Sequence, residues 1–282
     1  MIKRTLEISD GPTFLRIEND QLVLERHKEE LARVPAEDIG ILLVDSASTT
    51  YTHSVFTRLL DHGAAIVLCG ENHLPTGMLL GFEQSALVAQ RVRLQAEAPK
   101  PLCKRLWRQI VQHKIRAQSK NMPADDPAAP ILLELARSVR SGDAANAEGQ
   151  AARLYWPALF GPEFRRDRDG LPPNNLLNYG YAVLRAAVAR ALVSAGLHPA
   201  IGLHHHNRSN AFCLADDLLE VLRPRVDAVV IELYLQRRLE LDRQSRATLL
   251  TLLVDEISVA GQSGPLMVGL HRITASLVRC LE

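Results

Sequence analysis

The sequence lacks both a strong excess of charge and a pattern of paired cysteines. Its 33 lysine and arginine residues nearly balance its 32 aspartate and glutamate residues, so the whole molecule has no positive field that would attract nucleic acid unaided. The four cysteines are far apart and form no Cys-x-x-Cys pair: they are Cys69, Cys103, Cys213 and Cys280. This spacing argues against a disulfide framework and against a thiolate zinc site, and any DNA contact must come from local basic patches.

Long apolar runs are also missing. No uninterrupted run approaches the ~20 residues of a membrane-spanning helix, and no apolar segment follows the early positive charges of the N-terminus as it would in a secretion signal. We therefore expect a soluble cytoplasmic protein that has no membrane partner.

The first part of the chain reads as short strands separated by turns. We predict strands at 5–8, 13–18, 21–24, 39–44, 65–68 and 77–80. Asp10-Gly11-Pro12 and Asn19-Asp20 supply turn residues, and one helix at 52–62 ends at Gly63.

Beyond Phe82 the pattern changes to helical spacing. We predict helices at 85–96, 102–120, 130–140, 146–156, 176–195 and 214–222, with proline- and glycine-containing breaks between them. The fold class is therefore predicted as α+β, with a small N-terminal β-rich domain at 1–82 and a larger all-helical C-terminal domain at 83–282.

Imidazoles and carboxylates are concentrated between residues 202 and 220. Three consecutive histidines, at 204–206, precede a predicted helix that carries Asp216, Asp217 and Glu220. These acids share one helix face, where their mutual repulsion is costly without a cation. Consecutive side chains of an extended segment alternate in direction, so at most two of the histidines can bind one metal ion.

Two interpretations of this stretch remain open on spacing alone. In one, the acids form a solvated face with Arg223 and Arg225 as partners. In the other, one neutral imidazole and two carboxylates bind Mg²⁺ or Mn²⁺, because hard oxygen ligands favour these ions over structural zinc. Such a metal site suits phosphodiester chemistry, in which the ion activates a hydroxyl group and stabilises charge on the phosphate.

Basic residues cluster between 91 and 120, where Glu97 is the single acid. They can neutralise backbone phosphates or simply cover a solvated helix face. The candidate DNA-binding residues here are Lys104, Arg105, Arg108 and Lys114, and a second group contains Arg165 and Arg166. Trp107, Tyr155 and Trp156 are interpreted either as stacking platforms for unpaired bases or, more commonly for such aromatics, as core residues.

Four ordered blocks carry a resemblance to a known family. They are Glu-Gly-x-x-Ala-Arg-x-Tyr-Trp at 148–156, Leu-Asn-Tyr-Gly-Tyr at 177–181, Gly-Leu-His-His-x-Asn-x-x-Asn-Ala-Phe at 202–212 and Leu-Ala-Asp-Asp-Leu-x-Glu-x-x-Arg-Pro-x-Val-Asp at 214–227. Together they resemble the CRISPR-associated protein one family, the integrase of CRISPR adaptation, and most closely its type II branch. The division into a strand-rich and a helical part extends the resemblance over nearly the whole chain.

The resemblance implies a site and a substrate. It promotes Glu148, which alone reads as an ordinary surface residue, to a catalytic metal ligand together with His205 and Glu220. Asp217 and His204 take secondary places beside them. The metal would be Mg²⁺ or Mn²⁺, and the reaction would insert short foreign double-stranded DNA into CRISPR repeat DNA by attack of 3′-hydroxyl groups, in the service of antiviral defence.

The resemblance also implies partners. The chain would form a homodimer through its N-terminal domain and join CRISPR-associated protein two. Two other functions keep a place beside the integrase. One is a metal-dependent DNA repair nuclease that uses the same ligands with water as the nucleophile. The other is a non-catalytic DNA-binding scaffold, for which the basic helices matter and the ligands do not.

Overall fold

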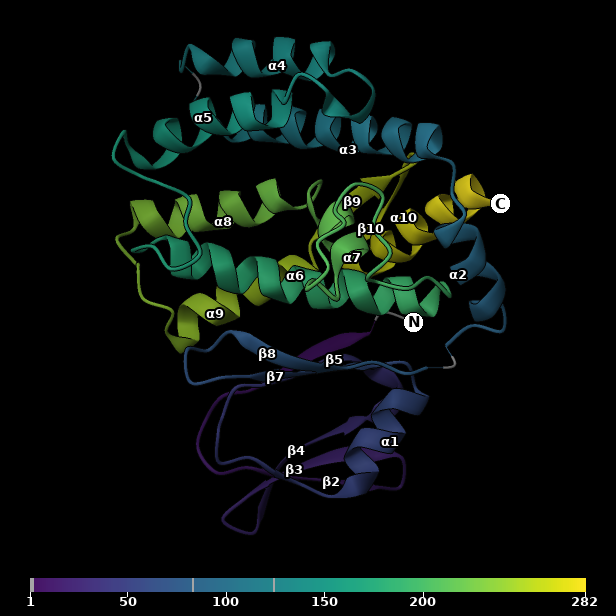
Figure 1. Ribbon diagram of the computed structural model, residues 1–282. Helices are drawn as coiled ribbons and strands as arrows, with labels where there is room; N and C mark the ends of the chain where they lie inside the picture. The colour runs from purple at the N-terminus through teal and green to yellow at the C-terminus, as the bar shows by residue number, and fades with distance from the viewer. Residues whose placement is uncertain (1–2, 83, 124) are drawn as a thin grey trace.

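The computed structural model describes residues 3–82, 84–123 and 125–282 (Figure 1). Residues 1 and 83, at which the two predicted domains begin, lie outside the described residues. The strands are β1 (Arg4–Ile8), β2 (Phe14–Glu18), β3 (Gln21–Arg26), β4 (Glu29–Pro35), β5 (Ile39–Val44), β6 (Thr50–Tyr51), β7 (Ala65–Cys69), β8 (Pro75–Leu79), β9 (Glu256–Val259) and β10 (Gln262–Pro265). The α-helices are α1 (His53–Asp61), α2 (Val88–Ala96), α3 (Lys100–Asn121), α4 (Ala128–Ser138), α5 (Ala147–Phe160), α6 (Asn174–Ser194), α7 (Cys213–Leu219), α8 (Arg223–Leu235), α9 (Arg243–Leu250) and α10 (Leu266–Leu281).

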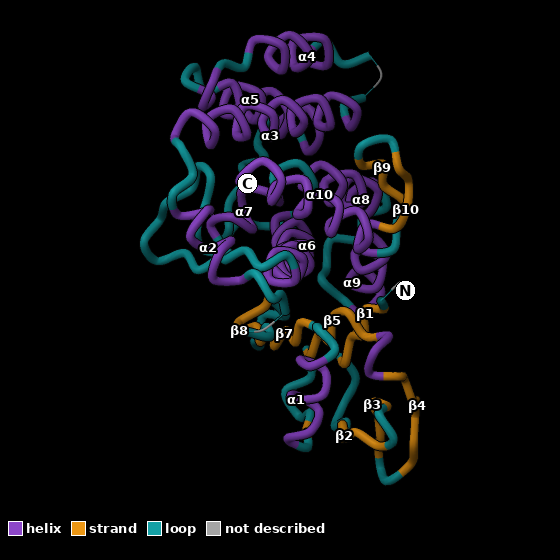
Figure 2. Tube along the Cα trace, turned by 90° about the vertical axis from the view of Figure 1, so that its right-hand side faces the viewer, coloured by secondary structure: helices purple, strands orange, loops and turns teal. Residues whose placement is uncertain are grey.

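Two sheets make up the N-terminal part. One has the order β1-β5-β7-β8, with β8 antiparallel to β7 and the other pairs parallel, and the second has the order β4-β3-β2-β6. Figure 2 shows the first sheet edge-on, between α6 on one side and α1 with the second sheet on the other. Because both of its faces are covered, its central strand β5 is a continuous apolar run that is buried throughout.

The side chains of β5 divide between two cores. Leu42 and Val44 pack with Leu59 of α1 and the second sheet, whereas Ile41 and Leu43 pack with the helical part of the chain. This alternation follows from the period of two in a strand. The first sheet therefore supports the helices that carry the candidate site.

The helices form layers above this sheet, with α6 lying on β7 and β8 and buried on nearly all sides. In Figure 1, α3 and α5 lie above α8, and α4, which packs against both of them, is the outermost helix. Buried ion pairs also tie α9 to the sheet, since Arg246 contacts Glu7 of β1 at 2.8 Å and Asp45 at 3.2 Å. Within the described residues, no helix is long and apolar enough to cross a membrane.

The α+β fold class is confirmed, with strands first and helices after them. The six predicted strands and seven predicted helices are present with ends shifted by a few residues. One detail was wrong: the helical part is not all helical, because β9 and β10 form a hairpin that packs against α10. Five further elements, β4, β6, α8, α9 and α10, were not predicted.

Candidate active site

Lys114 lies on the buried face of α3. It follows Trp107 by two helical turns and Val111 by three residues, so these side chains point to the same side of the helix. Trp107 and Val111 are buried, and only 13% of the Lys114 side chain is exposed. Its ammonium group donates to Oε1 of Glu148 and to Oε2 of Glu220, both at 2.5 Å. Lys114 thus lies between two of the predicted metal ligands, where we expected a phosphate contact.

Glu148 lies in the first turn of α5, and the residues before the helix fix that turn. Asp143 accepts hydrogen bonds from the backbone N–H groups of Ala147 and Glu148 at 2.8 and 3.1 Å. The cap residue Asn146, with φ 51°, accepts one from Gly149 at 3.1 Å. A Cβ atom on Gly149 would lie 2.6 Å from the side-chain oxygen of Asn146, so a larger residue would displace the cap. These hydrogen bonds fix the first turn of α5, and Gly149 leaves room for the cap. The turn, held in place, positions the carboxylate of Glu148.

The loop that carries the histidines is organised around Asp217, which is fully buried in α7. Its Oδ2 accepts hydrogen bonds from the backbone of Leu203 at 2.6 Å and of His204 at 3.0 Å, and its Oδ1 accepts one from Nδ1 of His205 at 2.6 Å. The last bond leaves Nε2 of His205 available, and it raises the pKa of the imidazole by stabilising the protonated form. Asp217 therefore holds the backbone of the loop and orients the ring of His205.

Trp107 forms the floor beneath two of the histidines. Its ring stacks on His204 with centroids 4.2 Å apart and an interplanar angle of 2°, and it meets His205 edge-on at 5.4 Å. Because Trp107 is 1% exposed, it is a core residue and not a platform open to unpaired bases. Burial lowers the pKa of His204, opposite in direction to that of His205. The neighbouring imidazoles therefore differ in their readiness to carry a proton.

Glu220 directly follows α7 and lies in a buried environment beside two positively charged side chains. Its side chain is 6% exposed, and besides Lys114 it forms an ion pair with Arg223 at 2.9 Å. Burial opposes ionisation of this carboxyl, but Lys114 and Arg223 outweigh burial and lower its pKa. Burial likewise opposes the charge on Lys114, and the two carboxylates outweigh it and raise its pKa. Lys114 and Glu220 therefore stabilise each other in their charged forms.

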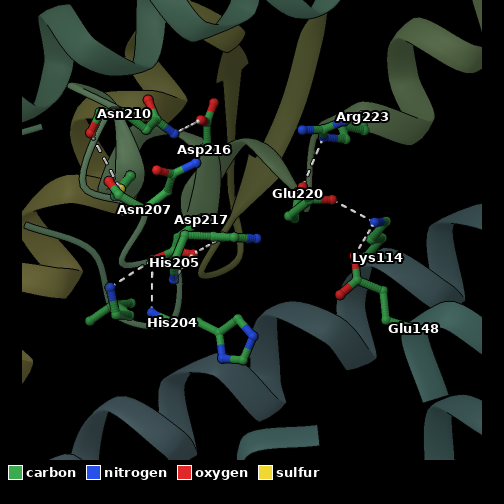
Figure 3. A network of polar contacts seen from close by, with 12 residues as sticks. Lys114, Glu148, His204, His205, Asn207, Asn210, Asp216, Asp217, Glu220 and Arg223 are labelled. Atoms are coloured by element: carbon green, nitrogen blue, oxygen red, sulfur yellow. Dashed lines mark hydrogen bonds and ion pairs between the residues drawn. The ribbon is translucent and has the colours of Figure 1, made fainter. Parts of the chain in front are cut away.

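The structure brings the predicted ligands to one region, in which Lys114 lies between the two carboxylates and His205 faces them (Figure 3). Within the described parts of the chain, however, no three His, Cys, Asp or Glu side chains lie close enough together to hold a metal ion. The donor types fit a divalent ion with a preference for oxygen ligands, and the Lys114 ammonium is a cation already placed between the two carboxylates. A metal ion at this point would therefore take over part of the space of that ammonium.

Asp216, the remaining acid of α7, contacts residues other than the predicted metal ligands. It accepts hydrogen bonds from Arg185 at 2.6 Å and from Asn210 at 2.7 Å, which neutralises it and ties the end of the histidine loop to α7. The repulsion between Asp216 and Glu220 is therefore offset by Arg185 and Arg223, and no metal ion is needed at Asp216.

The predicted DNA-binding residues fall into two groups. Lys104, Arg105 and Arg108 are exposed on α3, as a phosphate contact requires. Arg165 is also exposed, although it bonds to a nearby backbone carbonyl, whereas Arg166 bonds within the protein. Arg165 donates to the carbonyl of Pro162 at 2.6 Å, and Arg166, which is partly buried, donates to Asn174 and Asn178 at 2.9 and 2.6 Å. The exposed basic residues of α3 lie on the same helix as Lys114, which contacts Glu148 and Glu220.

A buried network next to the site was not predicted from the sequence. Asp227 of α8 accepts hydrogen bonds from the hydroxyl groups of Tyr155 and Tyr181. The guanidinium of Arg223 lies 4.7 Å from the centre of the Tyr181 ring and so joins this network to Glu220. Tyr155, Tyr181 and Asp227 all belong to the conspicuous sequence blocks, which was the available signal that they act together.

Comparisons with known proteins identify the family that the sequence blocks resemble. A family model described as CRISPR associated protein Cas1 matches residues 6–256. A protein of Neisseria meningitidis serogroup C named CRISPR-associated endonuclease Cas1 is 40% identical over 280 residues, which cover 98% of this chain and 91% of that protein.

Two solved structures share the fold at low sequence identity. A casposase bound to integration product superposes with a TM-score of 0.80 at 19% identity, covering 99% of this chain and 90% of the casposase chain. A chain of a Cas6-RT-Cas1–Cas2 complex superposes with a TM-score of 0.78 at 18% identity, covering 99% of this chain and 35% of that one.

Proposed function

The chain belongs to the Cas1 family of CRISPR-associated proteins, and from that premise we propose that it is a metal-dependent DNA integrase and endonuclease of CRISPR adaptation. It inserts short foreign DNA fragments into the CRISPR array and so serves antiviral defence. The N. meningitidis relative is named an endonuclease, and the casposase with the same fold is bound to an integration product. The observation that carries the proposal is that Glu148 and Glu220 lie on either side of one cation, the Lys114 ammonium, and that His205 faces them.

These three side chains would hold the metal. A bound Mg²⁺ or Mn²⁺ ion supplies stabilisation of the negative charge that develops on the attacked phosphate. Asp217 contributes by fixing the ring of His205 with Nε2 outward, and Arg223 by holding Glu220 in place. Trp107 supports the loop from below.

The reaction is two transesterifications, one at each end of the inserted fragment. In each, the 3′-hydroxyl of the fragment attacks a phosphorus atom at a repeat boundary. A new P–O bond forms, the bond to the 3′-oxygen of the repeat strand breaks, and the released oxygen takes up a proton. The number of phosphodiester bonds is unchanged, so neither ATP nor a protein nucleophile is required.

The same proposal extends to partners. The chain forms a homodimer through its N-terminal domain, joins CRISPR-associated protein two, and binds the double-stranded fragment and the repeat DNA. One solved relative of the fold is part of a Cas1–Cas2 complex. The strand β4 lies at the edge of its sheet, with Leu31 52% exposed, and so leaves an unpaired edge in the N-terminal part. On α3, Lys104, Arg105 and Arg108 are the exposed phosphate contacts.

A strand-transfer assay tests the proposal. The chain, the partner protein, a repeat-bearing plasmid and a labelled short duplex are combined with Mg²⁺ or Mn²⁺. We expect joined products that require the metal, and that disappear when the duplex ends in 3′-deoxynucleotides, because the attacking hydroxyl is then missing.

The other outcomes favour the other functions. Shortened duplex without any joined product indicates a repair nuclease in which water is the nucleophile. DNA binding without joining or cleavage under either metal indicates a scaffold, as does joining that is unchanged in a Glu220→Ala variant.

A further inference from the structure

The cation between Glu148 and Glu220 is the side-chain ammonium of Lys114. Lys114 contacts one oxygen of each carboxylate at 2.5 Å from a side chain that is 13% exposed. It lies on the same side of α3 as the buried Trp107 and Val111, so the ammonium reaches the carboxylates from the buried face of the helix. Figure 3 shows the Lys114 ammonium between the two glutamates, and His205 at the side of Glu220 that faces away from Lys114.

The charges of this cluster already balance. Glu148 and Glu220 carry two negative charges, and Lys114 and Arg223 carry two positive charges. A divalent cation added without any rearrangement would lie next to the Lys114 ammonium in a largely buried space, and this repulsion is strongly unfavourable. One of the resident cations therefore has to withdraw when a metal ion enters.

The geometry selects the cation that withdraws. Arg223 contacts Glu220 through Oε1 and also lies 4.7 Å from the centre of the Tyr181 ring, so it is held from two sides. Lys114 contacts Oε2 of Glu220 and Oε1 of Glu148, and so occupies the space between the two carboxylates that would hold the metal. It also has a flexible four-carbon stem and a single point charge, which allow it to move.

Resting on the proposed metal-dependent function, we propose that Lys114 is an internal counter-cation that a metal ion displaces, and that its freed ammonium then pairs with a phosphate of the bound DNA. Without DNA, the lysine competes with the metal and lowers its affinity. With DNA, the phosphate offers the lysine another partner and the competition weakens. Metal and DNA therefore bind with positive cooperativity, and each raises the affinity of the other by the same factor.

Calorimetric titration of the full chain with Mn²⁺ tests this coupling, in the absence and presence of a short DNA duplex. The variants are Lys114→Gln, Lys114→Met, which keeps the apolar stem, and the control Lys120→Gln, which removes an equal charge from an exposed position of the same helix. Without DNA, we expect the Lys114 variants to bind Mn²⁺ about tenfold more tightly or better, because two uncompensated carboxylates attract the ion. The control should match the wild type.

DNA should tighten Mn²⁺ binding more in the wild type than in the Lys114 variants, because only the wild type has an ammonium to release. The tightening of Mn²⁺ binding by DNA can be measured with the wild type alone. Thermal denaturation checks that the Lys114 variants are folded. If the wild type binds Mn²⁺ and the folded Lys114 variants bind it equally or more weakly, displacement is wrong while the metal-dependent function stands. If neither the wild type nor the variants bind Mn²⁺, the metal site itself is wrong, and the inference falls with it.

Discussion

Asp217 holds the imidazole of His205 through a 2.6 Å hydrogen bond from Nδ1 to Oδ1. Because a carboxylate only accepts hydrogen bonds, the proton lies on Nδ1, and Nε2 keeps its lone pair toward the site. The same carboxylate accepts the backbone N–H groups of Leu203 and His204, so the position of the loop and the orientation of the ring depend on one buried side chain.

An Asp217→Asn variant should therefore lose joining activity by about 10- to 100-fold. The amide that replaces the carboxylate can donate to Nδ1, which places the proton on Nε2 and removes the lone pair from the site. The rate of joined-product formation measures the effect, and Asp61→Asn, which makes the same exchange at an exposed position of α1, is the control. Equal rates for the two variants would show that the tautomer of His205 is irrelevant.

Trp107 combines a core position with a site position, because the ring that stacks on His204 is 1% exposed. A Trp107→Ala variant should lower the free energy of unfolding by about 3 kcal/mol or more, since a large buried ring leaves a cavity when it is removed. Urea denaturation measures this. A loss below about 1 kcal/mol would mean that the surrounding helices close the gap and that Trp107 is not the floor of the histidine loop.

Asp227 gives the stability of the chain a specific pH dependence. Burial raises its pKa from 3.8 to about 6, with the hydrogen bonds from Tyr181 and Tyr155 opposing that rise. A carboxyl whose pKa is raised by folding contributes stability below pH ~4, and this contribution is lost as the pH rises through ~6. The loss is about 3 kcal/mol for a shift of this size.

An Asp227→Asn variant removes that titration. The difference in unfolding free energy between the wild type and the variant should therefore move in favour of the variant between pH ~4 and ~6 and be constant above that range. Urea denaturation at a series of pH values provides the comparison. A difference that is the same at every pH would show that Asp227 is not protonated in the folded state over this range.

The strand-then-helix organisation could be predicted because it depends on local patterns. The run at β5 and the amphipathic spacing of α1 are visible in the sequence itself. The strand β4 was missed because five consecutive side chains of Glu29–Pro35 are exposed and it forms by backbone pairing with β3. No element was predicted in α8–α10, although α10 buries Leu266, Leu270 and Leu277 along one side, a helical spacing that was there to be used.

For the site, sequence blocks supplied residue types and order but not distances. Lys114 was expected on DNA because it lies among basic residues, whereas its partners Glu148 and Glu220 are 34 and 106 positions away. One local signal pointed inward, since Lys114 follows Trp107 by seven residues on the same helix face. The use of Arg166 inside the protein had no comparable signal, because its hydrogen bonds to Asn174 and Asn178 depend on how the segment before α6 folds back.

If His205 acts at the metal in DNA joining, its loss should differ sharply from the loss of the histidine beside it. Strand transfer with Mn²⁺ or Mg²⁺ is measured for the wild type, for His205→Ala, and for His206→Ala, which removes an exposed imidazole from the next position of the same loop. The account predicts that His205→Ala loses joined product by about a hundredfold or more, since removing a ligand exceeds the effect of disturbing its support, while His206→Ala keeps most of the wild-type rate. Joining by His205→Ala at the rate of His206→Ala would contradict it.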